Sequence, residues 1–310
     1  MAIKWRSKIL LFKLEATYGT DPTPSGASNA IYAKDVEIRP MEGTDVSRDL
    51  EKPWLGADET IAAELHARIT FKVELAPSGT AGTAPAWGPM LRACGVAEVI
   101  VPGTSVAYNP VTDAHESGTL YLYIGDTLYA SNGLRGTAKL NLTAQSVPVI
   151  EFEFTGLFVA PAEGTRPSVD LTAFKKPQLV TDAFTPTFTI GGTSFVMRSA
   201  MLDLGNAVER RFLVGKEEII ITEKQEVFET TVEAVALTTF DPFAAAIGQN
   251  QVAVNLVHGT GAGKISTLAI PAAQMQRPQG LANAQDVKEW PLRLVPLPVA
   301  GNDQWTLTLT

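Results

Sequence analysis

The sequence predicts a mainly β protein, built from two tandem β-sandwich or half-barrel units that each carry one short flanking α-helix. Three observations support this fold class. Apolar and polar residues alternate along 119–156, as in Lys139-Leu140-Asn141-Leu142, which is the period of a strand with one buried face. The 20 prolines and 25 glycines suit many short strands joined by turns. Helix signals are few.

The composition is that of a globular chain with a modest negative charge. Of the 310 residues, 45% are hydrophobic, and the formal net charge is −8. That charge argues against tight binding of nucleic-acid phosphates, which requires clustered Lys and Arg. Cys94 is the only cysteine, so an intramolecular disulfide and a disulfide-stapled secreted fold are excluded.

The N-terminal segment does not have the features of a targeting sequence. Its apolar run, 9–12, ends at Lys13 and is shorter than the about 7–15 residues of a signal-peptide core. No run approaches the roughly 20 apolar residues of a membrane span. We therefore expect the chain to be made and kept in the cytoplasm, or to reach its site by assembly.

Period-2 alternation and turn residues predict strands along the whole chain, and one face of each sheet is expected to be buried. In order, the predicted strands are 7–15, 31–39, 61–75, 119–124, 127–131, 135–143, 149–158, 184–190, 193–204, 217–235, 251–257, 264–270, 288–297 and 304–309.

Two short segments carry helix signals. Residues 84–95 have Pro89 near the start and Gly95 at the end, which is the usual order of these residues in a helix. Residues 239–250 repeat this arrangement, with Pro242 and Gly248 in matching positions.

The matching helices are part of a longer internal repeat. A strand-like run precedes each helix, and a charged stretch that ends in glycine lies further upstream in both halves. We interpret this as a duplicated unit of strands, a short helix and a hairpin. The first unit covers 1–163 and the second covers 180–310, and the turn-rich segment 164–179 is interpreted as a linker.

The stretch 41–60 carries dense charges of both signs and an aromatic residue between two strands. Trp54 would be out of place on a plain surface loop, whereas an aromatic anchor among charges suits docking on a neighbouring subunit. The alternative is a loop that packs on its own chain. The residues expected to dock are Glu42, Asp45, Arg48, Asp49, Glu51, Lys52 and Trp54.

No motif indicates catalysis, a metal or a cofactor. HGTGAGKIS (258–266) resembles a phosphate-binding loop, but the spacing between its glycines is too short and Ile265 stands where a hydroxyl is needed. The three histidines lie in different segments without metal-ligand spacing. Cys94 is expected to be a small buried hydrophobe. The sequence therefore predicts that the protein is not an enzyme.

Two blocks resemble the major tail proteins, or tail tube proteins, of long non-contractile-tailed phages, and Mu-like siphophages are the subgroup suggested. They are LFKLEATYGTDPTPSGASNAIYAKDVEIRP (11–40), most specific over 8–24, and LYIGDTLYASNGLRGTAKLNLTAQSVPVIEFEFTGLFVAP (122–161). The resemblance covers the first half, and the second half shares it only through the internal repeat.

The resemblance implies a structural virion protein of the phage tail, assembled in the cytoplasm of the bacterial host. Tail tube domains form rings by joining sheets between neighbours, and the rings stack into a channel through which DNA passes without sequence-specific binding. Residues 1–30 would be an N-terminal arm and 41–60 a stacking loop. Rings would be hexameric, or trimeric with pseudo-six-fold symmetry if each chain supplies two units. The tail tip, tape measure and tail terminator proteins would be further partners.

If acidic side chains line such a channel, they would keep DNA from adhering, although charges are screened within about 8 Å at physiological salt. Strand parity suggests Glu37, Glu64, Glu74, Glu226 and Glu233 as lumen-facing residues.

The alternative function is a β-sandwich binding module of the carbohydrate-binding or adhesin type. Such a module would need clustered aromatic residues on a concave face. The five tryptophans are scattered in sequence, although folding could gather them.

Overall fold

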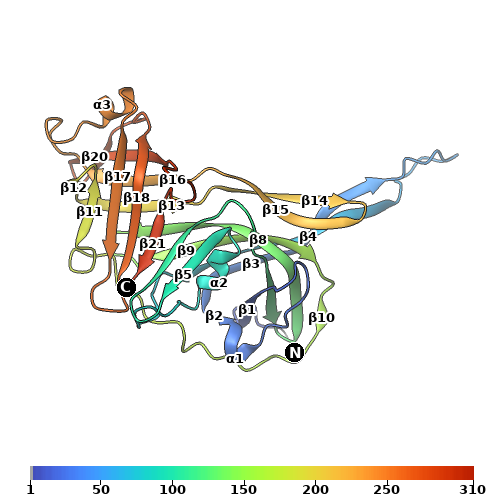
Figure 1. Cartoon of the computed structure of the whole chain (residues 1–310). Coiled ribbons are helices and arrows are strands. Elements are labelled where there is room, and N and C mark those ends of the chain that lie inside the picture. The colour runs from blue at the N-terminus through green and yellow to red at the C-terminus, as the bar shows by residue number, and fades with distance from the viewer. Residues whose placement is uncertain (1–2) are drawn as a thin grey trace.

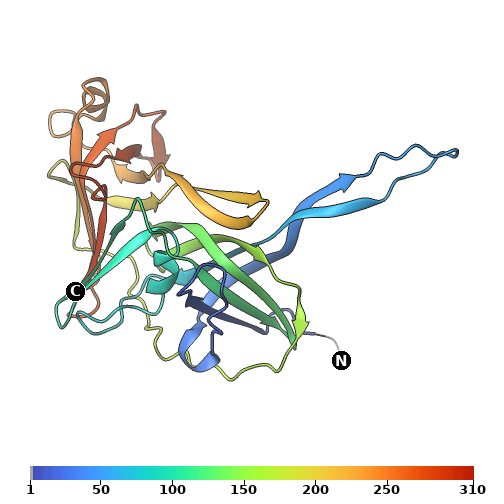
Figure 2. The same ribbon diagram turned by 45° about the vertical axis from the view of Figure 1, so that its right-hand side comes forward.

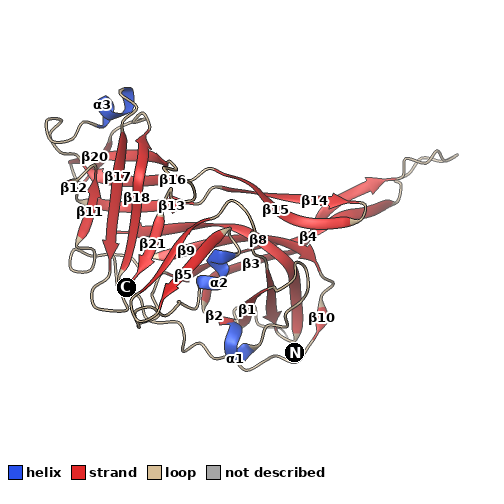
Figure 3. Ribbon diagram, in the orientation of Figure 1, coloured by secondary structure: helices blue, strands red, loops and turns tan. Residues whose placement is uncertain are grey.

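The computed structural model describes residues 3–310 and is mainly β, as predicted (Figure 3). Its helices are short: α1 (Gly26–Asn29), α2 (Gly88–Arg92) and α3 (Pro242–Ile247). None of the helices in the described residues has the length and apolar character needed to cross a membrane. Residues 1–2 lie outside the described part.

The first unit contains ten strands. They are β1 (Lys8–Leu14), β2 (Ala30–Ile31), β3 (Ala33–Ser47), β4 (Thr60–Glu74), β5 (Val96–Val101), β6 (Ser105–Pro110), β7 (Gly118–Ile124), β8 (Thr127–Thr143), β9 (Val149–Phe158) and β10 (Ala162–Glu163).

The second unit contains the remaining strands. They are β11 (Thr187–Ile190), β12 (Thr193–Ser194), β13 (Met197–Asp203), β14 (Asn206–Leu213), β15 (Lys216–Lys224), β16 (Val227–Glu233), β17 (Gln251–His258), β18 (Ser266–Met275), β19 (Ala282–Ala284), β20 (Val287–Pro296) and β21 (Thr306–Leu309).

One antiparallel sheet runs through both units in the order β3-β4-β9-β8-β13-β16-β20-β19. We call it the long sheet. The two units meet in it where the C-terminal half of β8 pairs with β13, for example Leu140 opposite Leu202. The first four strands belong to the first unit and the last four to the second, so the units are joined edge to edge.

A second set of strands, in the order β5-β6-β21-β18-β17-β11-β12, also crosses between the units. The C-terminal strand β21 lies between β6 of the first unit and β18 of the second. The chain is therefore tied together twice. The predicted division into two domains stays a prediction, because hydrogen-bonded strands run across the boundary.

The first unit closes over its core because β8 is long enough to belong to two layers. Its N-terminal half pairs with β7, which pairs with β1, and a register shift between Gly118 and Leu120 helps the strands to turn. Phe12 of β1 stacks on Phe154 of β9 with ring centroids 5.6 Å apart. Burying such aromatic side chains supplies much of the stability of a β core.

The two longer helices lie within the segments that the sequence predicts to be helical, but they are shorter than expected. Each follows a strand of the long sheet, β4 or β16. In α3 the Asp241 side chain accepts hydrogen bonds from the N–H groups of Phe243 and Ala244, which caps the N-terminus. In α2 proline occupies the first turn.

Two hairpins project in the same direction from the two units (Figures 1 and 2). The outer parts of β3 and β4 form one, and β14 and β15 form the other. The β3–β4 hairpin reaches further, and its loop spans 48–59. The predicted loop 41–60 is therefore right in place but too wide, since 41–47 continue β3.

Other expectations need correction. The expected arm over 1–30 is wrong for 8–14, because β1 pairs with β7 and residues 9–12 are buried in the first unit. The strands β5, β6, β10, β14 and β19 were not predicted. The segment 164–179 contains no helix or strand, and its interpretation as a linker stays a prediction.

Candidate interaction surfaces

The potentially reactive side chains His258 and Cys94 are buried in the fold. No group of three or more His, Cys, Asp or Glu side chains within 3–310 could hold a metal ion. His258 is buried, with Nδ1 3.0 Å from the Thr185 hydroxyl and Nε2 3.2 Å from the Gln178 carbonyl. Cys94 is buried in the core, and this burial raises the pKa of its thiol.

The β3–β4 hairpin exposes apolar side chains at its end. Trp54 is 70% exposed and Leu55 is 103% exposed, and Leu50 also lies open to solvent. Exposed apolar groups of this size on a projecting element are typical of a contact with another molecule. The hairpin is the first candidate interaction surface.

The docking residues predicted from the sequence all lie on this hairpin, and the structure divides them. Glu42 is half-buried, whereas the other six are exposed: Asp45, Arg48, Asp49, Glu51, Lys52 and Trp54. Arg48 pairs with Glu59 across the loop at 3.3 Å, and Lys52 pairs with Asp58. These two ion pairs therefore form within the hairpin, whereas the apolar side chains at its tip stay exposed to solvent.

The β14–β15 hairpin instead packs on the first unit. Ile219 and Ile221 are buried. The Ile219 N–H donates to the Tyr18 hydroxyl at 2.6 Å, and Arg135 donates to the Ile219 carbonyl at 2.8 Å. The second unit therefore reaches across the β8–β13 boundary to cover the end of the first unit.

A half-buried lysine fixes the base of this hairpin. The Lys224 ammonium donates to the carbonyl oxygens of Gly95 and Val111, at 2.6 Å for Val111. Burial is the main cause that lowers the pKa of Lys224 to about 8. Asn206, at the start of β14, donates to the Cys94 carbonyl at 2.7 Å. Both contacts reach the segment that follows α2.

The two hairpins meet at a histidine. Arg210 of β14 donates to Nε2 of His66 on β4 at 2.7 Å, so Nε2 acts as acceptor, and Nδ1 donates to the Glu64 carbonyl at 2.8 Å. The Glu42 carboxylate is 3.5 Å from the same Nε2. A hydrogen bond from Arg39 is the main cause that lowers the pKa of Glu42.

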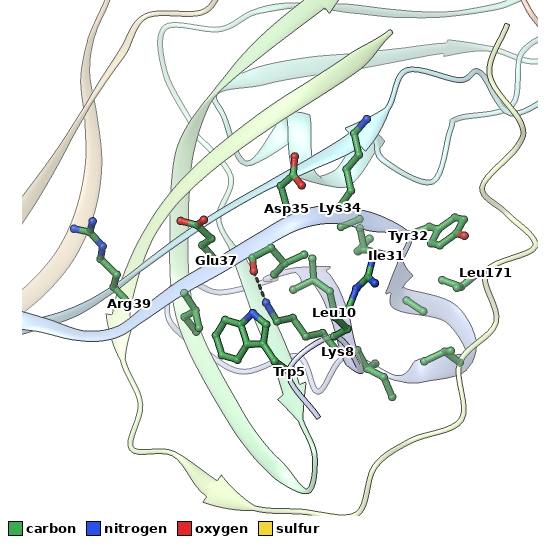
Figure 4. Close-up of a pocket in the computed structure, with 17 residues that line it drawn as sticks. Trp5, Lys8, Leu10, Ile31, Tyr32, Lys34, Asp35, Glu37, Arg39 and Leu171 are labelled. Carbon is green, nitrogen blue, oxygen red and sulfur yellow. Dashed lines mark hydrogen bonds between the residues drawn. The ribbon is translucent and has the colours of Figure 1, made fainter. Parts of the chain in front are cut away.

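The outer edge of β3 is open. In the part of the chain that the structure describes, β3 pairs with β4 on one side and with no strand on the other. A groove of about 910 Å3 runs beside this edge (Figure 4). Lys8 donates to the Val36 carbonyl at 2.6 Å from within the groove, and burial lowers the pKa of Lys8.

The opposite end of the long sheet is also open. The short strand β19 pairs with β20, and no other strand pairs with it among residues 3–310. Leu281, which precedes β19, is 61% exposed. Open edges present unpaired N–H and C=O groups, and proteins usually cover them or use them to bind another strand.

The polar face of the long sheet carries paired charges rather than an excess of acid. Lys72, Glu151, Lys139 and Asp203 lie opposite one another on β4, β9, β8 and β13. Lys72 and Glu151 approach to 3.1 Å, and Lys139 and Asp203 to 2.8 Å across the boundary between the units. Each charged side chain in this row therefore lies beside one of opposite charge on the neighbouring strand.

The expected lumen-facing residues are spread over several environments. Glu37 and Glu74 lie on the polar face, and Glu233 is exposed at the end of β16. Glu64 lies in the β3–β4 hairpin. The expectation for Glu226 is wrong, since this residue is buried between β15 and β16 and its burial raises its pKa.

The two open edges were not identified from the sequence, since pairing between strands distant in the chain leaves no local pattern. One sequence signal near an open edge was available. Leu281 is a large apolar residue within a turn-rich segment, as Trp54 is within a charged loop. No protein-family model matches this chain, and no curated protein matches it.

Proposed function

We propose that this chain is a structural subunit that assembles with copies of itself into stacked rings, as the major tail tube protein of a long non-contractile-tailed phage. The observation that carries the proposal is the long sheet. It joins two similar units edge to edge through β8 and β13 and ends in an open strand on both sides, β3 and β19.

Open edges at the two ends of one sheet favour head-to-tail association. A contact between different surfaces on identical copies generates a closed ring when the rotation closes. Backbone hydrogen bonds carry much of such a contact, which leaves side chains little constrained. With two units in each chain, three copies would give a ring with pseudo-six-fold symmetry, and a ring of six chains is the alternative.

The β3–β4 hairpin suits contact between rings. It projects from the unit well beyond the β14–β15 hairpin (Figure 2), and its tip carries exposed Trp54 and Leu55. Aromatic side chains placed this way often dominate the binding energy of an interface. We assign the hairpin to stacking of one ring on the next.

The polar face of the long sheet is assigned to the channel wall. Its lysines and carboxylates are paired across neighbouring strands, and the whole chain has a formal net charge of −8. A wall without a cluster of free Lys and Arg binds DNA phosphates weakly. Tail tip, tape measure and tail terminator proteins are the further proposed partners in the virion.

The alternative of a carbohydrate-binding or adhesin-like module has less support. Trp87, Trp290 and Trp305 are buried in the core. The exposed indoles, Trp5 and Trp54, belong to different elements, the N-terminal segment and the β3–β4 loop. Sugar sites of this class usually gather aromatic rings on one concave face.

Electron microscopy of the purified protein tests the proposal. We expect rings or cylinders in negative stain with three- or six-fold projections, and a mass by light scattering that is a multiple of three chains. A protein that stays monomeric at high concentration, and forms no rings even with tail tip components, would contradict it. A clean hit on a glycan array would favour the binding module.

A further inference from the structure

The junction between the two units inside one chain contains buried apolar side chains. Leu140 of β8 lies opposite Leu202 of β13, and both are about 1% exposed. Leu142 lies opposite Ala200 on the same face. The junction is therefore an interface between two similar units whose register is known.

The internal repeat can be aligned through strand pairing, independently of the sequence. In the first unit, Ile69 of β4 lies opposite Phe154 of β9. In the second unit, Phe228 of β16 lies opposite Leu294 of β20. The pairs Val73–Ile150 and Val232–Trp290 lie four residues further along and fit the same alignment, so β4 corresponds to β16 and β9 to β20.

The alignment extends to the strand on each side. Ile38 lies opposite Ile69 as Leu202 lies opposite Phe228, so β3 corresponds to β13 and Ile38 to Leu202.

On the other side, the β19–β20 hairpin corresponds to the β8–β9 hairpin. Asn141 lies opposite Val149, and Ala282 lies opposite Glu289. The residues just before them, Leu140 and Leu281, therefore correspond.

The corresponding residues differ in burial, and the difference indicates where a neighbouring strand would bind. Leu140 is 1% exposed because β13 lies beside it, whereas Leu281 is 61% exposed beside an open edge. Ile38 is half-buried at the other open edge, whereas Leu202 is buried. Each open edge has the same place in its unit as one side of the internal junction.

We propose that β3 of one copy pairs antiparallel with β19 of a second copy, in the register that places Leu281 opposite Ile38. The geometry repeats the β8–β13 junction between chains. In this register Ala282 lies opposite Glu37 and Gly280 lies opposite Arg39, so small residues face large ones. The inference rests on the proposed self-assembly and adds which edges meet and in what register.

The groove beside β3 has a role in this arrangement. Inside the chain, the turn after β8 contacts the start of β13, where the Ala144 N–H donates to the Arg198 carbonyl at 2.8 Å. The corresponding turn, Gln285-Asp286, is a two-residue hairpin turn with φ of 55° and 64°. It would enter the groove near Ala33.

The charges at this point are complementary in part. Asp286 at the tip is acidic, and the groove is lined by Arg6, Lys8 and Lys34 as well as by Asp35 and Glu37. The tight turn and the groove therefore fit in position and offer opposite charges for Asp286.

Cysteine cross-linking tests the register. The variant carries Ile38→Cys and Leu281→Cys in one chain, and the native Cys94 is buried and leaves a clean background. Residues directly opposite on antiparallel strands have Cβ atoms about 4.5–5.5 Å apart, and diagonal neighbours about 7–8 Å, so mild oxidation to a disulfide should link chains into covalent oligomers. The control pairs Ile38→Cys with Asn283→Cys, which shifts the register by two residues, and should link at least tenfold more slowly.

The outcomes separate the inference from the proposed function. Fast linking of the Ile38/Leu281 pair with slow linking of the control supports the register. Faster linking of the control overturns it. Large assemblies by light scattering, with neither pair linked, overturn the edge pairing while self-assembly stands. Monomers under all conditions contradict both.

A substitution on the exposed side gives a second measure. Leu281→Asp places a charge where the second copy would bury a leucine, and we expect assembly to need at least tenfold more protein. Val299→Asp is the control, because Val299 is also exposed but lies in the loop before β21. Circular dichroism should show both variants folded. Equal assembly of the two variants would overturn the proposed contact.

Discussion

The two projecting hairpins each connect neighbouring strands of the long sheet, β3 with β4 and β13 with β16, but they have different surroundings. The β14–β15 hairpin buries Ile219 and Ile221 against the first unit and is held at its base by Lys224. The β3–β4 hairpin leaves Trp54 and Leu55 exposed at its tip. The β14–β15 hairpin lies against the first unit, whereas the tip of the β3–β4 hairpin extends beyond it and stays exposed.

This difference shows how one hairpin can stabilise its own chain while a similar hairpin stays available for contacts with other chains. A hairpin that finds a neighbour contributes buried apolar area to folding. A hairpin without one keeps its apolar side chains available for association, at the risk of aggregation. The following predictions test whether the two hairpins differ in this way.

The largest expected effect comes from shortening the β3–β4 hairpin. Replacing the loop 48–59 by Asn-Gly removes the exposed tip, and this dipeptide suits a two-residue turn. Under the proposed function, rings should still form but should no longer stack, as seen by negative-stain microscopy. Val214→Ser at the tip of the other hairpin is the control and should leave stacking intact. Normal tubes from the shortened protein would contradict the role of this hairpin.

The next largest effect is expected on the free energy of unfolding, at β15. Ile219→Ala removes a buried side chain at the docked hairpin and should lower the free energy of unfolding by about 2–4 kcal/mol. Leu55→Ala at the exposed tip should change it by less than about 0.5 kcal/mol. Urea denaturation of the monomer measures both. Equal effects would mean that the two hairpins do not differ in packing.

A pH-dependent effect is expected at the base of β14–β15. The pKa of Lys224 is lowered to about 8 in the folded chain, from an ordinary value of 10.5. Between these values the unfolded chain binds the proton more strongly, so stability should rise with pH between about 8 and 10. Lys224→Met should flatten this rise.

The Lys224 effect is best measured as a difference, because tyrosines titrate at higher pH. Burial raises the pKa of Tyr18, which lowers stability as the pH passes 10. Subtracting the urea denaturation midpoints of Lys224→Met from those of the unchanged protein removes this contribution. A difference that does not change between pH 7.5 and 9.5 would argue against a lowered pKa of Lys224.

The smallest effect is expected where the hairpins meet. Arg210→Ala leaves the buried Nε2 of His66 without its donor and should cost about 1 kcal/mol, since an unsatisfied buried polar atom is unfavourable. Hydrogen exchange should also become faster in the outer half of β4. Arg211→Ala, at the exposed neighbouring position, serves as control. The same exchange rates in both variants would show that this contact does not couple the hairpins.

Local pattern predicted many strands well. The strand predicted at 149–158 has the bounds of β9, and 61–75 differs from β4 by one residue at each end. In both strands one face is buried, so burial imposes period-2 alternation on the sequence. In β14 the charged residues Glu209, Arg210 and Arg211 hide this alternation, because most of the strand lies outside a core.

Errors arose where one predicted element contains two. The run 217–235 was predicted as one strand, but β15 ends at Lys224 and β16 begins at Val227. The break falls beside Glu226, so strand parity assigned that residue to the wrong environment. A one-residue change of phase moves every later side chain to the opposite face.

The sequence by itself determined the fold class, most strands, the two matching helices and the charged hairpin with Trp54, because each depends on residues close together in the chain. Only the tertiary structure decided that β8 pairs with β13, that β21 joins the two units, and that β3 and β19 are left open. Strand pairing is made by backbone groups that every residue carries, so the choice of neighbour depends on the packing of distant segments and leaves little mark on any one of them.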